Sequence, residues 1–272
     1  MIATMPDVWL VIPTRGRPHN LGRLLTNPNT MLEANVSAMV VLDHDDPELG
    51  GYHEELRCAV RGGYGARLWW RHSDRPHPGA GHSSYRRNVN LGADVAFGRG
   101  ASHVIVLGDD MRPRSPGYAN VLATAAGEWT LSYPNDGYQG PKLPTAICMP
   151  RGVWAALGGE VLPLPVEHLY SDDYWLALGR GWPRNSSDKL HVPEGIGINY
   201  CPSVAVDHLH PHAGKAETDA GYEAIYSSDL PERDGEHWRA YRASGQLEAD
   251  IRRVRGARAT AEALKAARGD GS

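Results

Sequence analysis

Residues 104–113 have the sequence VIVLGDDMRP, and this stretch gives the clearest indication of the fold. Val104–Leu107 is a run of β-branched and apolar residues, which predicts a buried strand. Asp109 and Asp110 follow it at the point where open α/β sheets bind their ligands. Two adjacent carboxylates repel each other and are costly to desolvate unless a positive charge lies beside them. We therefore expect a divalent cation and a phosphate-bearing substrate here, with a solvated polar corner as the alternative.

The composition is that of an ordinary globular protein. The 272 residues are enough for one large α/β domain or two small ones, and a hydrophobic content of 41% argues against disorder. The formal net charge of -4 gives no electrostatic basis for binding of the whole chain to nucleic acid or membranes. Cys58, Cys148 and Cys201 are widely separated, which argues against a disulfide framework or a zinc cluster and fits a reducing cytoplasm. The chain shows neither a signal-peptide pattern nor the roughly 20 apolar residues of a membrane span.

Strands alternate with helices over the first 110 residues, which predicts a mostly parallel, doubly wound α/β sheet with flanking helices. Strands are expected at residues 8–12, 38–42, 68–70 and 104–107, and helices at residues 20–25 and from Ser83 or Ser84 to Phe97. The first strand is expected to stop at Pro13, which has no N–H for a ladder. Polar clusters follow three of the strands, at residues 13–17, 43–46 and 108–110. Because the carboxyl ends of parallel strands meet at one edge, we expect these clusters to form a single cleft.

The second half of the chain has many Pro and Gly residues and shows no repeat or linker, so we expect one domain over residues 1–220. Short strands are expected at residues 129–133, 145–149, 196–200 and 204–206, and helices at residues 152–157 and 172–178. Residues 221–272 are expected to form a C-terminal helical extension whose basic tail, residues 249–272, carries six cations and three carboxylates. A solvated helix is the simpler explanation of this tail, and a contact with nucleic acid or a partner is the alternative.

Several short motifs in combination resemble the GT-A glycosyltransferases, most closely the family-2-like group, over roughly residues 7–210. The segment VIPTRGRP at residues 11–18 resembles the opening strand and loop of that group, where Pro-Thr-Arg lies beside the nucleotide. A strand end followed by two guanidinium groups also suits a pyrophosphate on physical grounds. The expected nucleotide-sugar contacts in this loop are Pro13, Thr14, Arg15 and Arg17, with a basic surface turn as the alternative.

Two further segments extend the resemblance on the nucleotide side. Asp43 ends the second strand and matches the acidic residue that contacts uracil or an equivalent base in such enzymes; an Asx turn is the alternative. The segment SYRRNVNLG at residues 84–92 resembles the Arg-Asn-x-Gly segment at the start of the helix before the metal motif. An arginine and a helix N-terminus together attract phosphate. The expected contacts here are Arg86, Arg87 and Asn88, and a pair of surface arginines is the alternative.

Gly108-Asp109-Asp110 takes the place of the Asp-x-Asp metal motif of the family. It departs from the motif because a glycine stands where the first Asp would be. Adjacent side chains of a strand point to opposite faces, so both carboxylates can approach one ion only if the chain turns, which Gly108 makes easier. The resemblance implies that Asp110 binds Mn²⁺ or Mg²⁺ directly and that Asp109 contacts the ribose or a metal-bound water.

The segment SDDYWL at residues 171–176 resembles the Glu-Asp-x-x-Leu element that begins a helix and supplies the catalytic base of inverting members. We expect Asp173 to be the base and Asp172 to be the second carboxylate of the element; the alternative is that both only cap the helix. Six residues are candidates for the acceptor side: Tyr133, Asn135, Asp136, Trp154, Tyr174 and Trp175. For the two tryptophans, placement in the core is the alternative.

The segment VDHLHPH at residues 206–212 resembles the C-terminal histidine that completes the metal site in several GT-A enzymes. His208 is the expected ligand because it follows the last strand directly. His210 and His212 would share its face if the strand continued. A zinc site made of the three histidines, or histidines on the surface, are the alternatives.

Together these resemblances imply a metal-dependent glycosyltransferase, with residues 1–113 binding the nucleotide sugar and residues 114–220 holding the acceptor and catalytic groups. The donor is expected to be a nucleoside-diphosphate sugar, UDP-sugar foremost, and the base role of Asp173 implies inversion, although retention stays open. A hydroxylated base in phage-type DNA, a small metabolite and a saccharide all remain open as acceptors. A non-catalytic nucleic-acid-binding module is the other class of function. No membrane or protein partner is expected, and the location is cytoplasmic, in the host if the gene belongs to a phage.

Overall fold

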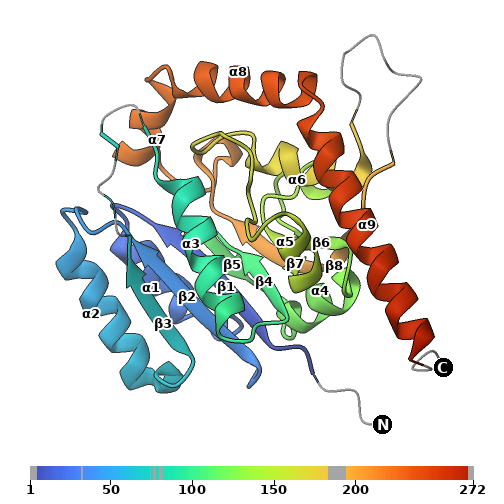
Figure 1. The fold of residues 1–272 in the computed structure, drawn as a ribbon. Helices are drawn as coiled ribbons and strands as arrows, with labels where there is room; N and C mark the ends of the chain where they lie inside the picture. The colour runs from blue at the N-terminus through green and yellow to red at the C-terminus, as the bar shows by residue number, and fades with distance from the viewer. Residues whose placement is uncertain are drawn as a thin grey trace.

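The computed structural model describes residues 5–31, 33–73, 75, 78–79, 82–182 and 194–268. In this part of the chain an eight-stranded sheet has the order β3-β2-β1-β4-β7-β6-β8-β5 (Figure 1). The strands are β1 (Val8–Thr14), β2 (Val36–Leu42), β3 (Leu68–His72), β4 (His103–Val106), β5 (Met111–Pro113), β6 (Leu131–Asn135), β7 (Ile147–Pro150) and β8 (Ile198–His208). The expected α/β architecture is therefore confirmed, with β8 as one strand where two short ones were expected.

The first half of the sheet is entirely parallel, and the second half is mixed. Strands β3, β2, β1 and β4 run parallel to one another, as expected from their alternation with helices. Strand β7 runs antiparallel to both β4 and β6, β8 is parallel to β6, and β5 is antiparallel to β8. The connection between β6 and β7 holds only a short 3-10 helix (Gly140–Lys142), which is too short for a parallel crossover. The sheet is thus mixed rather than mostly parallel.

Strand β1 does not stop at Pro13, because its hydrogen bonds with β4 end before Pro13 is reached. The N–H group that proline lacks is therefore not needed there. The Leu107 N–H donates to the Val11 carbonyl at 3.0 Å, which shows that Val11 faces β4. Pro13 faces the same side two residues later, beyond the last residue of β1 that pairs with β4. On the other side, β1 stays paired with β2 up to Thr14. The polar loop therefore begins two residues later than expected.

Helices cover both faces of the sheet. Helices α1 (Pro18–Leu25), α2 (Leu49–Ala59) and α4 (Tyr118–Ala126) pack on one face. Helices α3 (Tyr85–Gly98), α5 (Arg151–Ala156) and α6 (Ser171–Arg180) pack on the other. Leu10 faces the first layer and Val11 the second, and both are fully buried, which explains why β1 is a continuous apolar run.

The C-terminal part forms three helices, and the last two contribute to the core of the second layer. They are α7 (Ala220–Tyr226), α8 (Leu230–Ala243) and α9 (Gln246–Ala267), and α9 runs down the side of the molecule next to α5 and α6 (Figure 1). Ile251 and Val254 of α9 lie in the same core as the sheet. The buried carboxylate of Asp234, in α8, accepts hydrogen bonds from the N–H groups of residues 167–169 at 2.9, 3.0 and 2.9 Å. The extension therefore fixes the loop that precedes α6.

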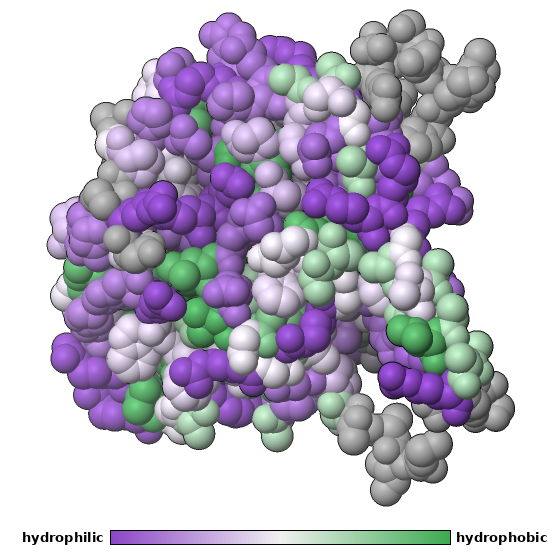
Figure 2. All heavy atoms as spheres, viewed as in Figure 1, coloured by the Kyte–Doolittle hydropathy of each residue, from purple (hydrophilic) through white to green (hydrophobic). Residues whose placement is uncertain are grey.

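The face of the molecule seen in Figure 2 is mostly hydrophilic, with small scattered apolar patches. Among the described residues, none of the helices has the length and apolar character needed to cross a membrane.

Gly92 provides a test of how closely α3 packs on the sheet. A Cβ atom at this position would lie 2.6 Å from Val11 Cγ1 and 3.0 Å from Val41 Cγ2. We expect Gly92→Ala to lower the free energy of unfolding by about 1–3 kcal/mol, because the packed strands cannot yield without distortion. The matched control is Gly256→Ala in the exposed part of α9, where a Cβ meets nothing within 4 Å and helix propensity predicts a gain of up to about 1 kcal/mol. Urea unfolding measures both, and equal effects would contradict the close contact.

Candidate active site

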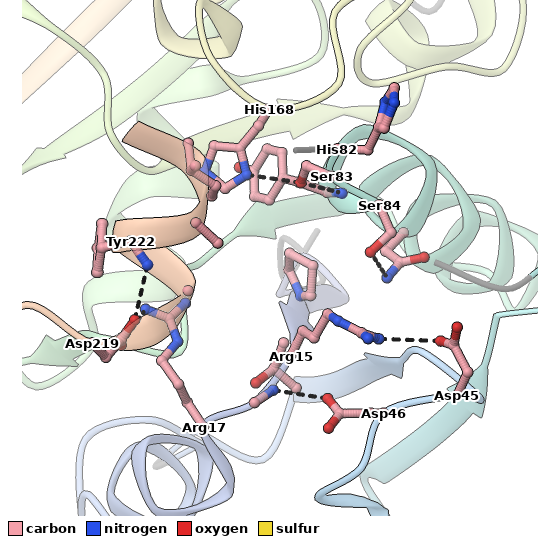
Figure 3. Close-up of a pocket in the computed structure, with 18 of the residues that line it drawn as sticks. Arg15, Arg17, Asp45, Asp46, His82, Ser83, Ser84, His168, Asp219 and Tyr222 are labelled. Atoms are coloured by element: carbon pink, nitrogen blue, oxygen red, sulfur yellow. Dashed lines mark hydrogen bonds and ion pairs between the residues drawn. The ribbon is translucent and has the colours of Figure 1, made fainter. Parts of the chain in front are cut away.

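A cavity of about 550 Å³ opens at the carboxyl ends of β1 and β2. Its lining comes from the loops after these two strands, the start of α3, the loop before α6, and α7 (Figure 3). The labelled residues around it are Arg15, Arg17, Asp45, Asp46, His82, Ser83, Ser84, His168, Asp219 and Tyr222. Two of the expected polar clusters line the cavity directly. The third, residues 108–110, contacts the lining residues Thr14, Arg17 and Tyr222.

Asp43 is the centre of a network beside the cavity. Its carboxylate is fully buried and accepts hydrogen bonds from five side chains: Arg15 (3.2 Å), Ser73 (3.3 Å), Ser84 (2.5 Å), Arg87 (3.2 Å) and Asn88 (2.9 Å). The resemblance implied that Asp43 contacts the base. In this arrangement the carboxylate orients Arg15 and Asn88, which line the cavity, and is itself enclosed by protein donors.

The two arginines at the start of α3 have different surroundings. Arg87 joins Asp43. The Arg86 side chain points to the loop at residues 160–162, where its Nε donates to the Leu162 carbonyl at 3.1 Å and its Nη2 lies 3.4 Å from Glu160. Of this expected pair, the structure therefore brings only Arg87 to the candidate site.

Asp109 holds the polar loop after β1. The Thr14 hydroxyl donates to its Oδ2 at 2.5 Å, and Arg17 Nη2 lies 2.8 Å from its Oδ1. Burial raises the pKa of Asp109 to about 6 against the opposing effect of Arg17. Arg17 also lies over the ring of Tyr222, at 5.4 Å from its centroid. The carboxylate thus fixes a guanidinium group in the wall of the cavity.

Asp110 faces the other way because the chain turns at Gly108. The Met111 N–H donates to the Gly108 carbonyl at 3.1 Å, closing a turn that separates the two adjacent carboxylates. A Cβ at position 108 would lie 2.5 Å from Asp110 Oδ1, so this turn leaves no room for the first Asp of the family motif unless Asp110 moves. The departure from Asp-x-Asp therefore has a steric reason in this chain.

Strand β5 brings Asp110 to His208. Met111 pairs with His208 in the β5–β8 ladder, and the Leu209 N–H donates to the Asp110 carbonyl at 3.0 Å. As a result Asp110 Oδ2 lies 3.6 Å from His208 Nε2, and it also accepts a hydrogen bond from the Tyr222 hydroxyl at 2.7 Å. Burial opposes ionisation of Asp110, but His208 and Arg17 hold its pKa well below the usual range.

Asp136 lies behind the imidazole of His208, with its Oδ2 at 3.5 Å from Nδ1. The Asp136 carboxylate is itself fixed by the N–H groups of residues 138–140 (3.0, 2.8 and 2.8 Å) and by the Thr145 hydroxyl (2.8 Å). Burial lowers the pKa of His208, but the Asp110 and Asp136 carboxylates raise it to about 9. A carboxylate on the far ring nitrogen is the arrangement that orients metal-binding histidines.

Asp110 and His208 offer an oxygen and a nitrogen that suit Mn²⁺. The described residues contain no cluster of three or more His, Cys, Asp or Glu side chains able to hold a metal ion. A cation here would therefore take its remaining ligands from substrate or water, as Mg²⁺ and Mn²⁺ sites with phosphates do. The three-histidine zinc site is not formed, because β8 ends at His208 and the rings of His210 and His212 pack on one another, with centroids 5.0 Å apart.

The two carboxylates at the start of α6 have different surroundings. Burial raises the pKa of Asp172 to about 7, with the charge of His208 opposing this rise. Burial also raises the pKa of Asp173, but its charged neighbour is Arg242 of α8. The charge of His208 therefore acts on Asp172, whereas that of Arg242 acts on Asp173, the base expected from the sequence.

Other candidates from the sequence lie in the core. Tyr133, Tyr174 and Trp175 are fully buried, which confirms the core alternative for Trp175 and places the two tyrosines in the core as well. Conversely, the sequence analysis did not single out Tyr222, Asp219 or His168, because they carry no motif and reach the cavity only through the fold.

No protein-family model and no curated protein sequence matches the chain. Among solved structures, the mannosyltransferase PcManGT from Pyrobaculum calidifontis, in complex with GDP-Man and Mn²⁺, matches 97% of this chain and 81% of its own at 13% identity, with a TM-score of 0.53. TarS of S. aureus gives a TM-score of 0.47 at 11% identity, over 93% of this chain and 53% of its own. Mannose-1-phosphate geranyltransferase from Thermus thermophilus gives 0.30 at 15% identity, over 47% and 41%. Only the first match carries weight, and it shows that the chain has a GT-A-like fold.

The network around Asp43 predicts a large difference between two carboxylates that share one arginine. Asp43→Ala leaves Arg15 and Arg87 without their buried counter-charge, and we expect it to lower the free energy of unfolding by about 3–5 kcal/mol. Asp45 pairs with the same Arg15 at 3.1 Å but is partly exposed, so Asp45→Ala should cost at most about 1 kcal/mol. Chemical denaturation of both variants measures the difference, and similar losses would show that Asp43 has no special role in the network.

Proposed function

We propose that this protein is a metal-dependent glycosyltransferase that moves a sugar from a nucleoside-diphosphate donor to an acceptor hydroxyl. The observation that carries the proposal is the convergence of two groups at one end of the sheet: the arginines that line the cavity, and the Asp110–His208 pair, which the lining residue Tyr222 contacts. The fold supports the proposal, because the mannosyltransferase of similar fold is a complex with GDP-Man and Mn²⁺.

The cavity offers both space and charge for the donor. Its volume of about 550 Å³ lies within the several hundred Å³ of common ligand pockets. Arg15 and Arg17 line it, and guanidinium groups bind phosphate oxygens through paired hydrogen bonds. UDP-sugar is the donor implied by the sequence resemblance, and the GDP-Man of the fold neighbour makes a GDP-sugar the second candidate.

The Asp110 carboxylate and His208 Nε2 would hold Mn²⁺ or Mg²⁺, with Asp136 fixing the imidazole from behind. When bound, the cation neutralises charge on the departing diphosphate. Arg17, fixed by Asp109, adds a positive charge from the opposite side of the polar loop.

Asp172 is the proposed base. Its carboxylate takes the proton of the acceptor hydroxyl while the hydroxyl oxygen bonds to the anomeric carbon. The bond from that carbon to the diphosphate breaks at the same time, and the diphosphate leaves with the electron pair. A pKa of about 7 suits proton transfer near neutral pH. Direct attack of this kind inverts the anomeric centre.

The basic tail gives little support to a nucleic-acid-binding module or a DNA acceptor. Its cations are largely engaged with carboxylates, in the pairs Arg255–Glu194 (2.9 Å), Arg258–Glu262 (2.8 Å) and Lys265–Glu128 (2.6 Å). A cation already paired with a carboxylate contributes less to phosphate binding.

A thermal-shift screen tests the donor site. UDP-, GDP-, TDP- and CDP-sugars are added with and without Mn²⁺, and at saturation one of them should raise the melting temperature by about 5 °C. Asp110→Asn should lose the part of this shift that needs Mn²⁺. Asp207→Asn is the matched control, since Asp207 lies one residue before His208 but pairs with Arg114 on the surface. If no donor stabilises the wild-type protein with Mn²⁺, the proposed function is wrong.

The two carboxylates of α6 give a second test, with water as the acceptor and release of nucleoside diphosphate as the measurement. Asp172→Asn should lower kcat by about 10²–10⁴, and Asp173→Asn should keep most of it. The base must be unprotonated, so the wild-type rate should rise as the pH increases through about 7 and then level off. A larger loss of kcat in Asp173→Asn than in Asp172→Asn would show that Asp173 is the base.

A further inference from the structure

A row of aromatic rings continues from the candidate active site along the surface. We call Tyr138, His210, His212, Tyr222 and Tyr226 the aromatic platform. Tyr138 stacks on His210 (5.6 Å, 14°), His210 contacts the edge of Tyr222 (4.9 Å), and Tyr222 is parallel to Tyr226 (6.3 Å, 9°). These rings come from the loop after β6, the segment after β8, and α7, so the fold assembles the platform from three separate parts of the sequence.

The platform is open to solvent at the ends of the row. Tyr226 is 44% exposed and Tyr138 is 39% exposed, so both rings are accessible to a ligand. A second hollow, of about 420 Å³, lies along the platform and is lined by His212, Tyr222 and Tyr226 among others. Tyr222 also lines the donor cavity, so the platform begins where that cavity ends.

The position of the platform relates it to the acceptor. Tyr222 joins the platform to the candidate active site, because its ring is parallel to that of Tyr226. Its hydroxyl donates to Asp110, the proposed metal ligand, at 2.7 Å. A molecule lying on the platform would thus have its end next to the proposed metal site.

The charge of this surface is negative. Residues 211–233 contain two cations, Lys215 and Arg233, and five carboxylates, Glu217, Asp219, Glu223, Asp229 and Glu232. Arg233 pairs with Asp229, and Arg17 lies 3.7 Å from Asp219, so the excess negative charge comes from Glu217, Glu223 and Glu232. The Lys215 ammonium group donates to the Gly137 carbonyl at 3.0 Å. Such a surface repels the phosphates of a nucleic acid, whereas carboxylates accept hydrogen bonds from neutral hydroxyl groups.

We propose that the aromatic platform is an acceptor subsite for a neutral saccharide, whose rings stack on the tyrosines while its hydroxyls bond to the neighbouring carboxylates. The apolar C–H face of a sugar ring is matched by a flat aromatic face, and the hydroxyl rim by acidic side chains. This inference rests on the proposed function and names the class of its acceptor.

Saturation-transfer NMR without donor or metal tests the subsite directly. The probes are methyl glycosides of glucose, mannose, galactose and N-acetylglucosamine, and a short oligothymidylate is the polyanionic comparison. At least one glycoside should bind the wild-type protein, and Tyr226→Ala should weaken that binding about tenfold. Tyr226→Phe keeps the ring and should bind like wild type. Trp70→Ala, which removes an exposed aromatic ring on β3, is the control for a surface change elsewhere.

Several outcomes would overturn the subsite: no glycoside binds, Tyr226→Ala binds as well as wild type, or only the oligothymidylate binds. Urea unfolding of each variant confirms that it is folded. The donor-induced thermal shift is measured on the same samples without glycosides. A missing thermal shift would then count against the proposed function, while the NMR result alone decides on the platform.

Discussion

The pairing of two fully buried carboxylates with arginines is the interaction on which the candidate site depends. Asp43 and Asp109 have no exposed surface, and a buried carboxylate is tolerated only with charged or hydrogen-bonding partners. Arg15 and Arg87 meet this need for Asp43, and Arg17 meets it for Asp109. The same contacts hold guanidinium groups at the carboxyl ends of the strands. The position of the guanidinium groups in the cavity wall is therefore a consequence of the acidic residues beneath them.

The turn at Gly108 gives the neighbouring residues Asp109 and Asp110 different partners. Asp109 pairs with Arg17, whereas Asp110 lies beside His208 because β5 pairs with β8. The carboxylate of Asp109 thereby points away from that of Asp110. The Asp110–His208 pair and the arginine cluster are thus joined by a three-residue segment and by Tyr222, whose hydroxyl donates to Asp110 and whose ring lies against Arg17.

Much of the fold followed from the sequence, because apolar runs and polar strand ends have strong local signals. The sequence also predicted that the polar clusters meet at one edge. The sequence could not show that the charge of His208 acts on Asp172 and that of Arg242 on Asp173. The two residues are adjacent at the start of α6, and their charged neighbours come from distant parts of the chain. Nor could the sequence find Tyr222 or the three-residue strand β5, whose places depend on contacts distant in the sequence. The roles of the site residues remain predictions.

The hydrogen bonds from residues 167–169 to Asp234 have a consequence for the order of events during translation. N-terminal parts of a chain emerge from the ribosome and fold first. The parallel half of the sheet is complete once β4 has emerged, but the N–H groups of the loop before α6 lack their acceptor until α8 has been made. The final helices are therefore made after the parallel strands, and the start of α6 is the last part of the molecule to be fixed.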